Sequence, residues 1–226
     1  MDDREHLNQR FLELDSLPVR LSREDAQNRG HEFEELVQDL FSIEKMLRKG
    51  SYHTSDGRSE QIDGALNIDG IRALLEIKWV SSGLAASALY SFIGKVEGKF
   101  VGTVGIFLSK AELSDNFLNS LRSGRRQCVI VIHGEDVDYL FKPTFPVKDY
   151  ITAILDHLSY DNQFHLSAKE FWRKNIRSLK KKTNIHPLIN KALETKDYTN
   201  IIYEWVEDIG SKDATDLSEK CIETYL

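Results

Sequence analysis

The sequence reads QIDGALNIDGIRALLEIKW over residues 61–79, with the pair Asp69-Gly70 at its centre. Apolar and polar side chains alternate on both sides of this pair, which is the period of a β-strand with one buried face. Asp-Gly between two alternating runs is a strong signal for a hairpin with a two-residue turn. The stretch therefore predicts two antiparallel strands in which Ile68 pairs with Ile71.

Extending this register places Asp63 opposite Glu76 and Gln61 opposite Lys78. Side chains that face each other across an antiparallel pair lie about 4.5–5.5 Å apart at Cβ. Two carboxylates held so closely repel each other unless a cation lies between them. A shift of one residue would exchange the two faces of each strand, so the alternation predicts this register and no other.

These residue types suit the hydrolysis of a phosphodiester bond. Mg²⁺ is bound in proteins by one or two carboxylates, while waters and substrate phosphate fill its other positions. Asp63 and Glu76 are the predicted metal ligands, and the backbone carbonyl of Ile77 offers a further oxygen. Lys78 follows on the same face as Glu76, where it can orient or deprotonate the attacking water and offset phosphate charge. We expect Mg²⁺ as the cofactor, with Mn²⁺ able to substitute.

The string Glu-x-Lys is weak by itself, because it occurs three times, beginning at Glu76, Glu97 and Glu194. Only the first copy lies in an alternating apolar strand opposite an aspartate. The alternative interpretation of that copy is a solvated strand face with a network of charges between neighbouring strands.

Several segments together resemble the PD-(D/E)XK nuclease superfamily, and more narrowly its Mrr-like restriction endonuclease branch. The matching segments are GHEFEEL at Gly30–Leu36, QIDG at Gln61–Gly64, LEIKW at Leu75–Trp79 and VGIFLS at Val104–Ser109. Ile62 stands where the superfamily name has proline, as it does in many members. The resemblance covers about residues 27–142.

By this resemblance Asp63, Glu76 and Lys78 form the catalytic triad, and Glu34 is the helix acid that reaches the metal. Gln61 matches a position that is often polar in this branch and is a candidate supporting residue. Position alone does not decide whether Glu34 has this role, because the helix dipole favours acids in the first turns of any helix. The implied activity is that of a metal-dependent endonuclease acting on DNA, in restriction or other defence against foreign DNA.

The order of elements predicts an α/β fold: a restriction-endonuclease-like mixed β-sheet flanked by helices, followed by an α-helical C-terminal region. A helix is expected from Gln27 to Arg48, a short helix at Asp115–Leu121 and an edge piece at Tyr139–Phe141. The predicted domains are an N-terminal helical lead-in over 1–26, the PD-(D/E)XK domain over 27–142, and a helical region with an interaction or DNA-contact role over 147–226.

Basic residues outside the hairpin are candidate contacts for the DNA backbone. Two of them follow the motif on a predicted helix, and three lie in a run with seven basic residues and one acid between positions 169 and 182; they are Lys95, Lys99, Arg173, Lys174 and Arg177. Solvated helix faces and pairing with the acidic stretches that follow are the alternatives.

The composition is that of an ordinary soluble globular protein, with 226 residues, 41% hydrophobic and 29% charged. The formal charge of −6 neither indicates nor excludes binding to nucleic acid. No apolar run approaches the ~20 residues of a membrane span, and the first residues do not resemble a signal peptide. Cys128 and Cys221 suggest neither a disulfide framework nor a zinc site. We therefore expect a cytoplasmic protein with no membrane partner.

Two further functions remain open from the sequence. The chain could be a binding or assembly subunit that keeps the nuclease fold without its chemistry, although no motif residue is lost. It could also be an effector nuclease that stays silent until a partner activates it. The expected partners are DNA, a second copy in a homodimer, and an activating or target-reading protein.

Overall fold

The computed structural model describes residues 3–18, 21–54, 60–80, 84, 86–114, 117 and 127–182, with side chains described up to residue 175. The chain divides into two units, Met1–Phe171 and Trp172–Leu226. The sheet and all of the residues from the hairpin motif belong to the first unit. The domain assignments made from the sequence stay predictions.

A five-stranded mixed sheet forms the centre of the first unit. Its strands lie in the order β1 (Leu47–Lys49), β4 (Gly64–Ile68), β5 (Ile71–Lys78), β6 (Val104–Ser109) and β7 (Val129–His133). Strand β4 runs antiparallel to both of its neighbours, β1 and β5, whereas β5, β6 and β7 run parallel to one another. A separate antiparallel pair joins β2 (Tyr52–His53) to β3 (Gln61–Ile62).

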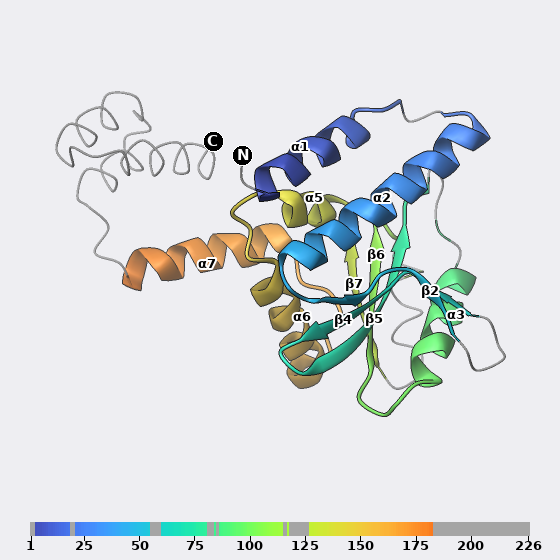
Figure 1. The fold of residues 1–226 in the computed structure, drawn as a ribbon. Helices are drawn as coiled ribbons and strands as arrows, with labels where there is room; N and C mark the ends of the chain where they lie inside the picture. The colour runs from blue at the N-terminus through green and yellow to red at the C-terminus, as the bar shows by residue number, and fades with distance from the viewer. Residues whose placement is uncertain are drawn as a thin grey trace, which may run out of the picture. The chain divides into compact units, whose positions relative to one another are not determined.

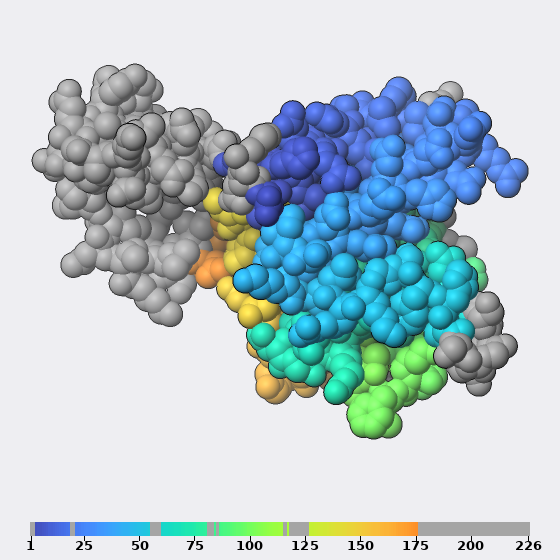
Figure 2. Space-filling view, viewed as in Figure 1, coloured from blue at the N-terminus to red at the C-terminus, as the bar shows by residue number. Residues whose placement is uncertain are grey.

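Helices flank this sheet (Figure 1). They are α1 (Asp3–Asp15), α2 (Arg23–Ile43), α3 (Ala86–Glu97), α5 (Glu135–Phe141) and α6 (Val147–Asp161). A further helix, α7 (Ala168–Lys182), begins at the end of the first unit and continues into the second. Helix α2 packs on α1 and β5, α3 packs on β6, and α5 and α6 pack on β7. Figure 2 shows α1 and α2 as a continuous blue surface on the face turned to the viewer. The predicted α/β class, with a mixed sheet between helices, is confirmed.

The hairpin register is confirmed over the length of β4. Ile68 pairs with Ile71 and the ladder continues to Gly64 opposite Leu75. Asp69 and Gly70 supply the turn with φ angles of 48° and 98°, the positive region that a tight two-residue turn requires.

The predicted pairing of Gln61 with Lys78 is wrong, because the strand changes its partner at Asp63. Residue 63 is a bend, and Gln61 before it pairs with His53 of β2. The Asp63 carboxylate turns toward β5 and accepts a hydrogen bond from the N–H of Ile77. In a continuous ladder, a main-chain carbonyl would accept this hydrogen bond.

Helix α2 begins earlier and ends earlier than predicted. The Ser22 hydroxyl caps its first turn by accepting the N–H of Asp25. At the other end Lys45 adopts a φ of 58°, which breaks the helical repeat, and Leu47–Lys49 then pairs with β4 as an edge strand.

Four aromatic rings join the helices to the end of β5. Phe11 of α1 stacks on Phe141 of α5 with ring centroids 4.1 Å apart, and Phe33 of α2 meets the Trp79 ring edge-on at 4.9 Å. The edge strand predicted at Tyr139–Phe141 is wrong, because these residues form the last turn of α5.

The remaining expectations concern the helices. The short helix expected at Asp115–Leu121 lies outside the described residues, apart from Phe117. Helices α6 and α7 agree with the helical character predicted for the C-terminal region. Among the described helices, none combines the length and the hydropathy that a bilayer-spanning segment needs.

Candidate functional site

Three of the predicted site residues meet at the C-terminal end of β5. Asp63 and Glu76 are buried, with exposures of 4% and 7%. The Lys78 ammonium lies 2.8 Å from Glu76 Oε1 and 3.4 Å from Asp63 Oδ2, and its side chain is 28% exposed. The structure therefore brings the two acids and the lysine into one ion-paired group, which we call the carboxylate cluster.

The backbone of Ile77 takes part on both of its sides. Its N–H donates to Asp63 Oδ2 at 2.8 Å, and its carbonyl accepts the Lys78 ammonium at 3.0 Å. The predicted carbonyl ligand and the predicted acids therefore share the same lysine.

Glu34 of α2 lies within electrostatic reach of the cluster. Its half-burial raises the pKa of its carboxyl, the Asp63 charge raises that pKa further, and Lys78 lowers it. The carboxyl of Glu34 is therefore coupled electrostatically to both acids of the cluster. Its role as the helix acid that reaches the metal stays a prediction.

Gln38 was missed by the sequence reasoning although it supports the site directly. Its Nε2 donates to the Asp63 carbonyl at 3.0 Å and to the Ser51 hydroxyl at 3.3 Å. This bonding holds the backbone at the bend where β3 ends. Gln38 follows Glu34 by four residues and so lies on the same helix face, a spacing that could have indicated it.

Lys95 of α3 binds the oxygen of Glu76 that Lys78 leaves free. Its ammonium lies 2.8 Å from Glu76 Oε2, so both oxygens of this carboxylate carry a lysine partner. One turn later, Lys99 pairs with Glu60 at 3.3 Å. The DNA contact expected of both lysines stays a prediction, and the sequence held no signal for the pairing of Lys95 with Glu76.

The charges of the cluster decide the protonation of Lys78. Burial alone would lower the pKa of its ammonium, but the neighbouring Asp63 and Glu76 carboxylates outweigh burial and raise it. Lys78 is therefore an ammonium at neutral pH in this state. It can donate hydrogen bonds and neutralise charge, whereas accepting a proton requires its carboxylate partners to be engaged elsewhere.

The donor set of the cluster fits a hard divalent cation. Among the described residues, no three or more His, Cys, Asp or Glu side chains form a metal-holding group. Mg²⁺ needs only one or two carboxylates, because water and phosphate oxygens complete its octahedron. Asp63, Glu76 and the Ile77 carbonyl supply oxygens of the required kind, and the acids already bind two ammonium cations.

For the other candidates, the described residues give no contact with this cluster. Gln61 is exposed on β3. Arg173 and Lys174 are exposed on α7 and belong to the second unit. The side chain of Arg177 lies outside the described residues. Their roles stay predictions.

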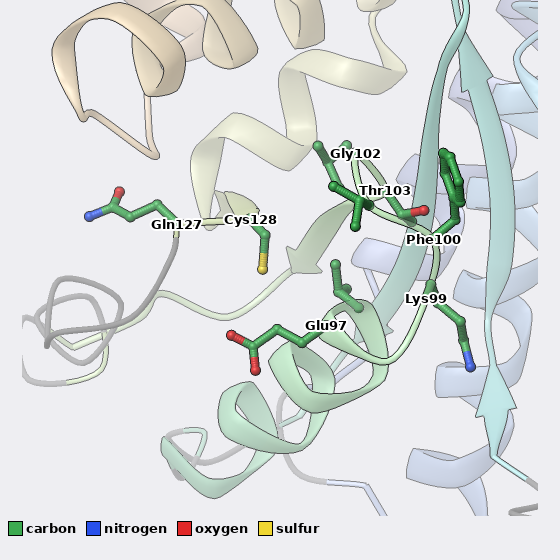
Figure 3. Close-up of a pocket in the computed structure, with 10 residues that line it drawn as sticks. Glu97, Lys99, Phe100, Gly102, Thr103, Gln127 and Cys128 are labelled. Carbon is green, nitrogen blue, oxygen red and sulfur yellow. The ribbon is translucent and has the colours of Figure 1, made fainter.

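A cavity of about 160 Å³ lies elsewhere, beside the turn from α3 to β6 and the residues before β7 (Figure 3). Lys99 and Cys128 line it, and none of the residues of the carboxylate cluster does. In Figure 3 the Lys99 side chain extends away from Cys128. The cavity is therefore distinct from the predicted site.

No protein-family model matches the sequence, and no curated protein matches it. Among solved structures, the fold is similar to that of the MspJI restriction endonuclease in complex with a 27-mer oligonucleotide. The sequences are 15% identical, the TM-score is 0.37, and the match covers 74% of this chain. It spans 38% of the MspJI chain.

Proposed function

We propose that this chain is a metal-dependent endonuclease of the PD-(D/E)XK type that hydrolyses phosphodiester bonds in DNA. The observation that carries the proposal is the hydrogen bond between Asp63 Oδ2 and the N–H of Ile77. It ties the acid of one strand to the peptide between Glu76 and Lys78, so that one cluster contains two buried carboxylates and an ammonium. The resemblance of these segments to the Mrr-like branch supports the same assignment.

Each residue of the cluster has a role in this proposal. Asp63 and Glu76 hold Mg²⁺ together with the Ile77 carbonyl, and Glu34 adds negative charge that strengthens cation binding. A Mg²⁺ ion bound there would supply an activated water and would neutralise charge on the phosphate. Lys78 donates hydrogen bonds to the attacking water or to a phosphate oxygen.

The proposed biological role is restriction or other defence against foreign DNA, and it rests on the sequence resemblance. A homodimer is part of this proposal, because cleavage of both strands calls for two such sites. A second candidate is an effector nuclease that is silent until a partner protein activates it. The ammonium groups on both oxygens of Glu76 favour that candidate, because they compete with a metal for the carboxylate.

Incubation with supercoiled plasmid tests the proposal, in Mg²⁺, in Mn²⁺ and in EDTA. We expect nicked or linear plasmid with either metal and none with EDTA. Mn²⁺ binding without cleavage would point to the silent effector. Absence of both cleavage and metal binding would contradict the nuclease and favour the assembly subunit.

A further inference from the structure

Lys95 is held at the carboxylate cluster by a helix that carries no other part of it. Its ammonium lies 2.8 Å from Glu76 Oε2, and its side chain is 17% exposed. Lys78 occupies Oε1 of the same carboxylate at 2.8 Å. A lysine so placed stands where a cation bound to Glu76 would otherwise be.

The packing of α3 on the sheet directs Lys95 to this position. Phe92, three residues earlier and on the same helix face, packs on Phe107 of β6 with ring centroids 6.0 Å apart. Phe107 is the residue that pairs with Glu76 in the parallel ladder. Phe107, on which the helix packs, and Glu76, which pairs with Lys95, are therefore neighbours on adjacent strands.

Lys99, two residues after the end of α3, provides an internal contrast. It is one turn further along, its side chain is 22% exposed, and it pairs with Glu60 rather than with Glu76. The two lysines thus share a charge and nearly the same burial, and they lie four residues apart. They differ in that only Lys95 contacts a proposed metal ligand.

We propose that Lys95 is a positioning residue with two successive partners. Its ammonium neutralises Oε2 of Glu76 in the metal-free protein, and it binds a phosphate oxygen of the DNA substrate once that carboxylate has taken up a divalent cation. This inference rests on the proposed function, since Glu76 is there a metal ligand.

Competition for one oxygen supplies the physical reason for the exchange. An ammonium and a divalent cation at Oε2 repel each other, so each lowers the affinity of the carboxylate for the other. When Glu76 is engaged, the helix still holds the ammonium beside the cluster. A free lysine ammonium is a compact point charge that suits a phosphate oxygen.

The first measurement is Mn²⁺ binding by calorimetry without DNA, on the wild type, Lys95→Met, Lys95→Arg and the matched control Lys99→Met. We expect Lys95→Met to bind Mn²⁺ about two- to fivefold more tightly, which corresponds to the loss of one competing ion pair. Lys95→Arg keeps the charge and is expected near the wild type, as is Lys99→Met. If Lys95→Met does not fold by circular dichroism, Lys95→Gln replaces it.

The second measurement is the salt dependence of binding to a short DNA duplex, with Ca²⁺ as the divalent cation. Loss of one phosphate contact lowers the slope of log K against log salt by about one unit, and we expect this for Lys95→Met. Unchanged or weaker Mn²⁺ binding by the variant would overturn the competition, and an unchanged slope would overturn the phosphate contact. A wild type that binds no Mn²⁺ would instead contradict the proposed function itself.

Discussion

The carboxylate of Asp63 accepts a hydrogen bond from the backbone N–H of Ile77 at 2.8 Å. The contact lies where the hairpin ladder stops, and there a side-chain oxygen replaces the main-chain carbonyl as the acceptor for the Ile77 N–H. It also fixes the acid at the peptide between Glu76 and Lys78. The bend that interrupts the strand at Asp63 thus also brings the Asp63 carboxylate to Glu76 and Lys78.

Substitution of Lys78 by methionine should separate chemistry from folding. We expect DNA cleavage to fall by about 10²–10³-fold, as when one preorganised donor to the transition state is lost. Without metal, the free energy of unfolding should fall by up to about 3 kcal/mol, because Asp63 and Glu76 lose their shared ammonium. Added Mg²⁺ should restore part of this loss.

Cleavage assays and urea unfolding with and without Mg²⁺ check this prediction. Lys148→Met is the matched control, because Lys148 forms an exposed pair with Asp69 at 3.1 Å, away from the carboxylate cluster. Full cleavage by Lys78→Met would show that this lysine has no part in the reaction.

Glu34 should make the metal-free protein less stable as the pH rises. Burial, followed by the Asp63 charge, raises the pKa of its carboxyl above the ordinary value of 4.5. The folded state therefore keeps a proton that the unfolded chain has already lost. The stabilisation is fully present below pH 4.5 and is lost as the pH rises through the raised pKa.

The variant Glu34→Gln should not show this loss. In EDTA at pH 7 we expect it to unfold at a higher temperature than the wild type, while it binds Mn²⁺ more weakly. Thermal unfolding between about pH 4 and 8 measures the effect. Glu35→Gln, at the exposed neighbouring position, controls for the loss of one helix acid. Identical pH profiles for wild type and Glu34→Gln would refute the prediction.

Gly105 allows α3 to approach the sheet. A Cβ atom at this position would lie 2.7 Å from Phe92 and 2.9 Å from both Val96 and Val129. We expect Gly105→Ala to lower the free energy of unfolding by about 1–3 kcal/mol, the usual cost of overpacking a core. Since α3 carries Lys95, displacement of the helix should also disturb the carboxylate cluster.

Chemical unfolding measures this cost. The control is Gly94→Ala, on helix α3. A Cβ at Gly94 would meet nothing within 4 Å, so alanine there should be neutral or stabilising. Equal stability of Gly105→Ala and the wild type would mean that the helix can shift freely on the sheet.

The sequence carried enough information to predict the hairpin and the central acids. Alternation of apolar residues and the Asp69-Gly70 turn specify a register that the structure confirms as far as Gly64. The same alternation continues through Ile62, although the strand changes partner at Asp63. A period-2 pattern shows which face a residue takes and does not show which strand it pairs with.

Errors elsewhere came from short or unusual local signals. Three apolar residues at Tyr139–Phe141 suggested a strand, whereas Val137, Leu140 and Phe141 are buried at helical spacing. The end of α2 depends on Lys45 in the left-handed region, where no glycine or asparagine marked a break. The contact between Lys95 and Glu76 depends on how α3 packs, which no local pattern encodes.

The central claim is that Asp63 is part of a metal-dependent site for DNA cleavage, and one comparison tests it most directly. Plasmid cleavage in Mg²⁺ is measured for the wild type, Asp63→Asn and the control Asp69→Asn, which changes an exposed acid in the turn of the same hairpin. We predict that Asp69→Asn cleaves like the wild type, and that Asp63→Asn is slower by at least about a hundredfold while keeping its fold by circular dichroism. Cleavage by Asp63→Asn at the wild-type rate, or cleavage that persists in EDTA, would contradict the account.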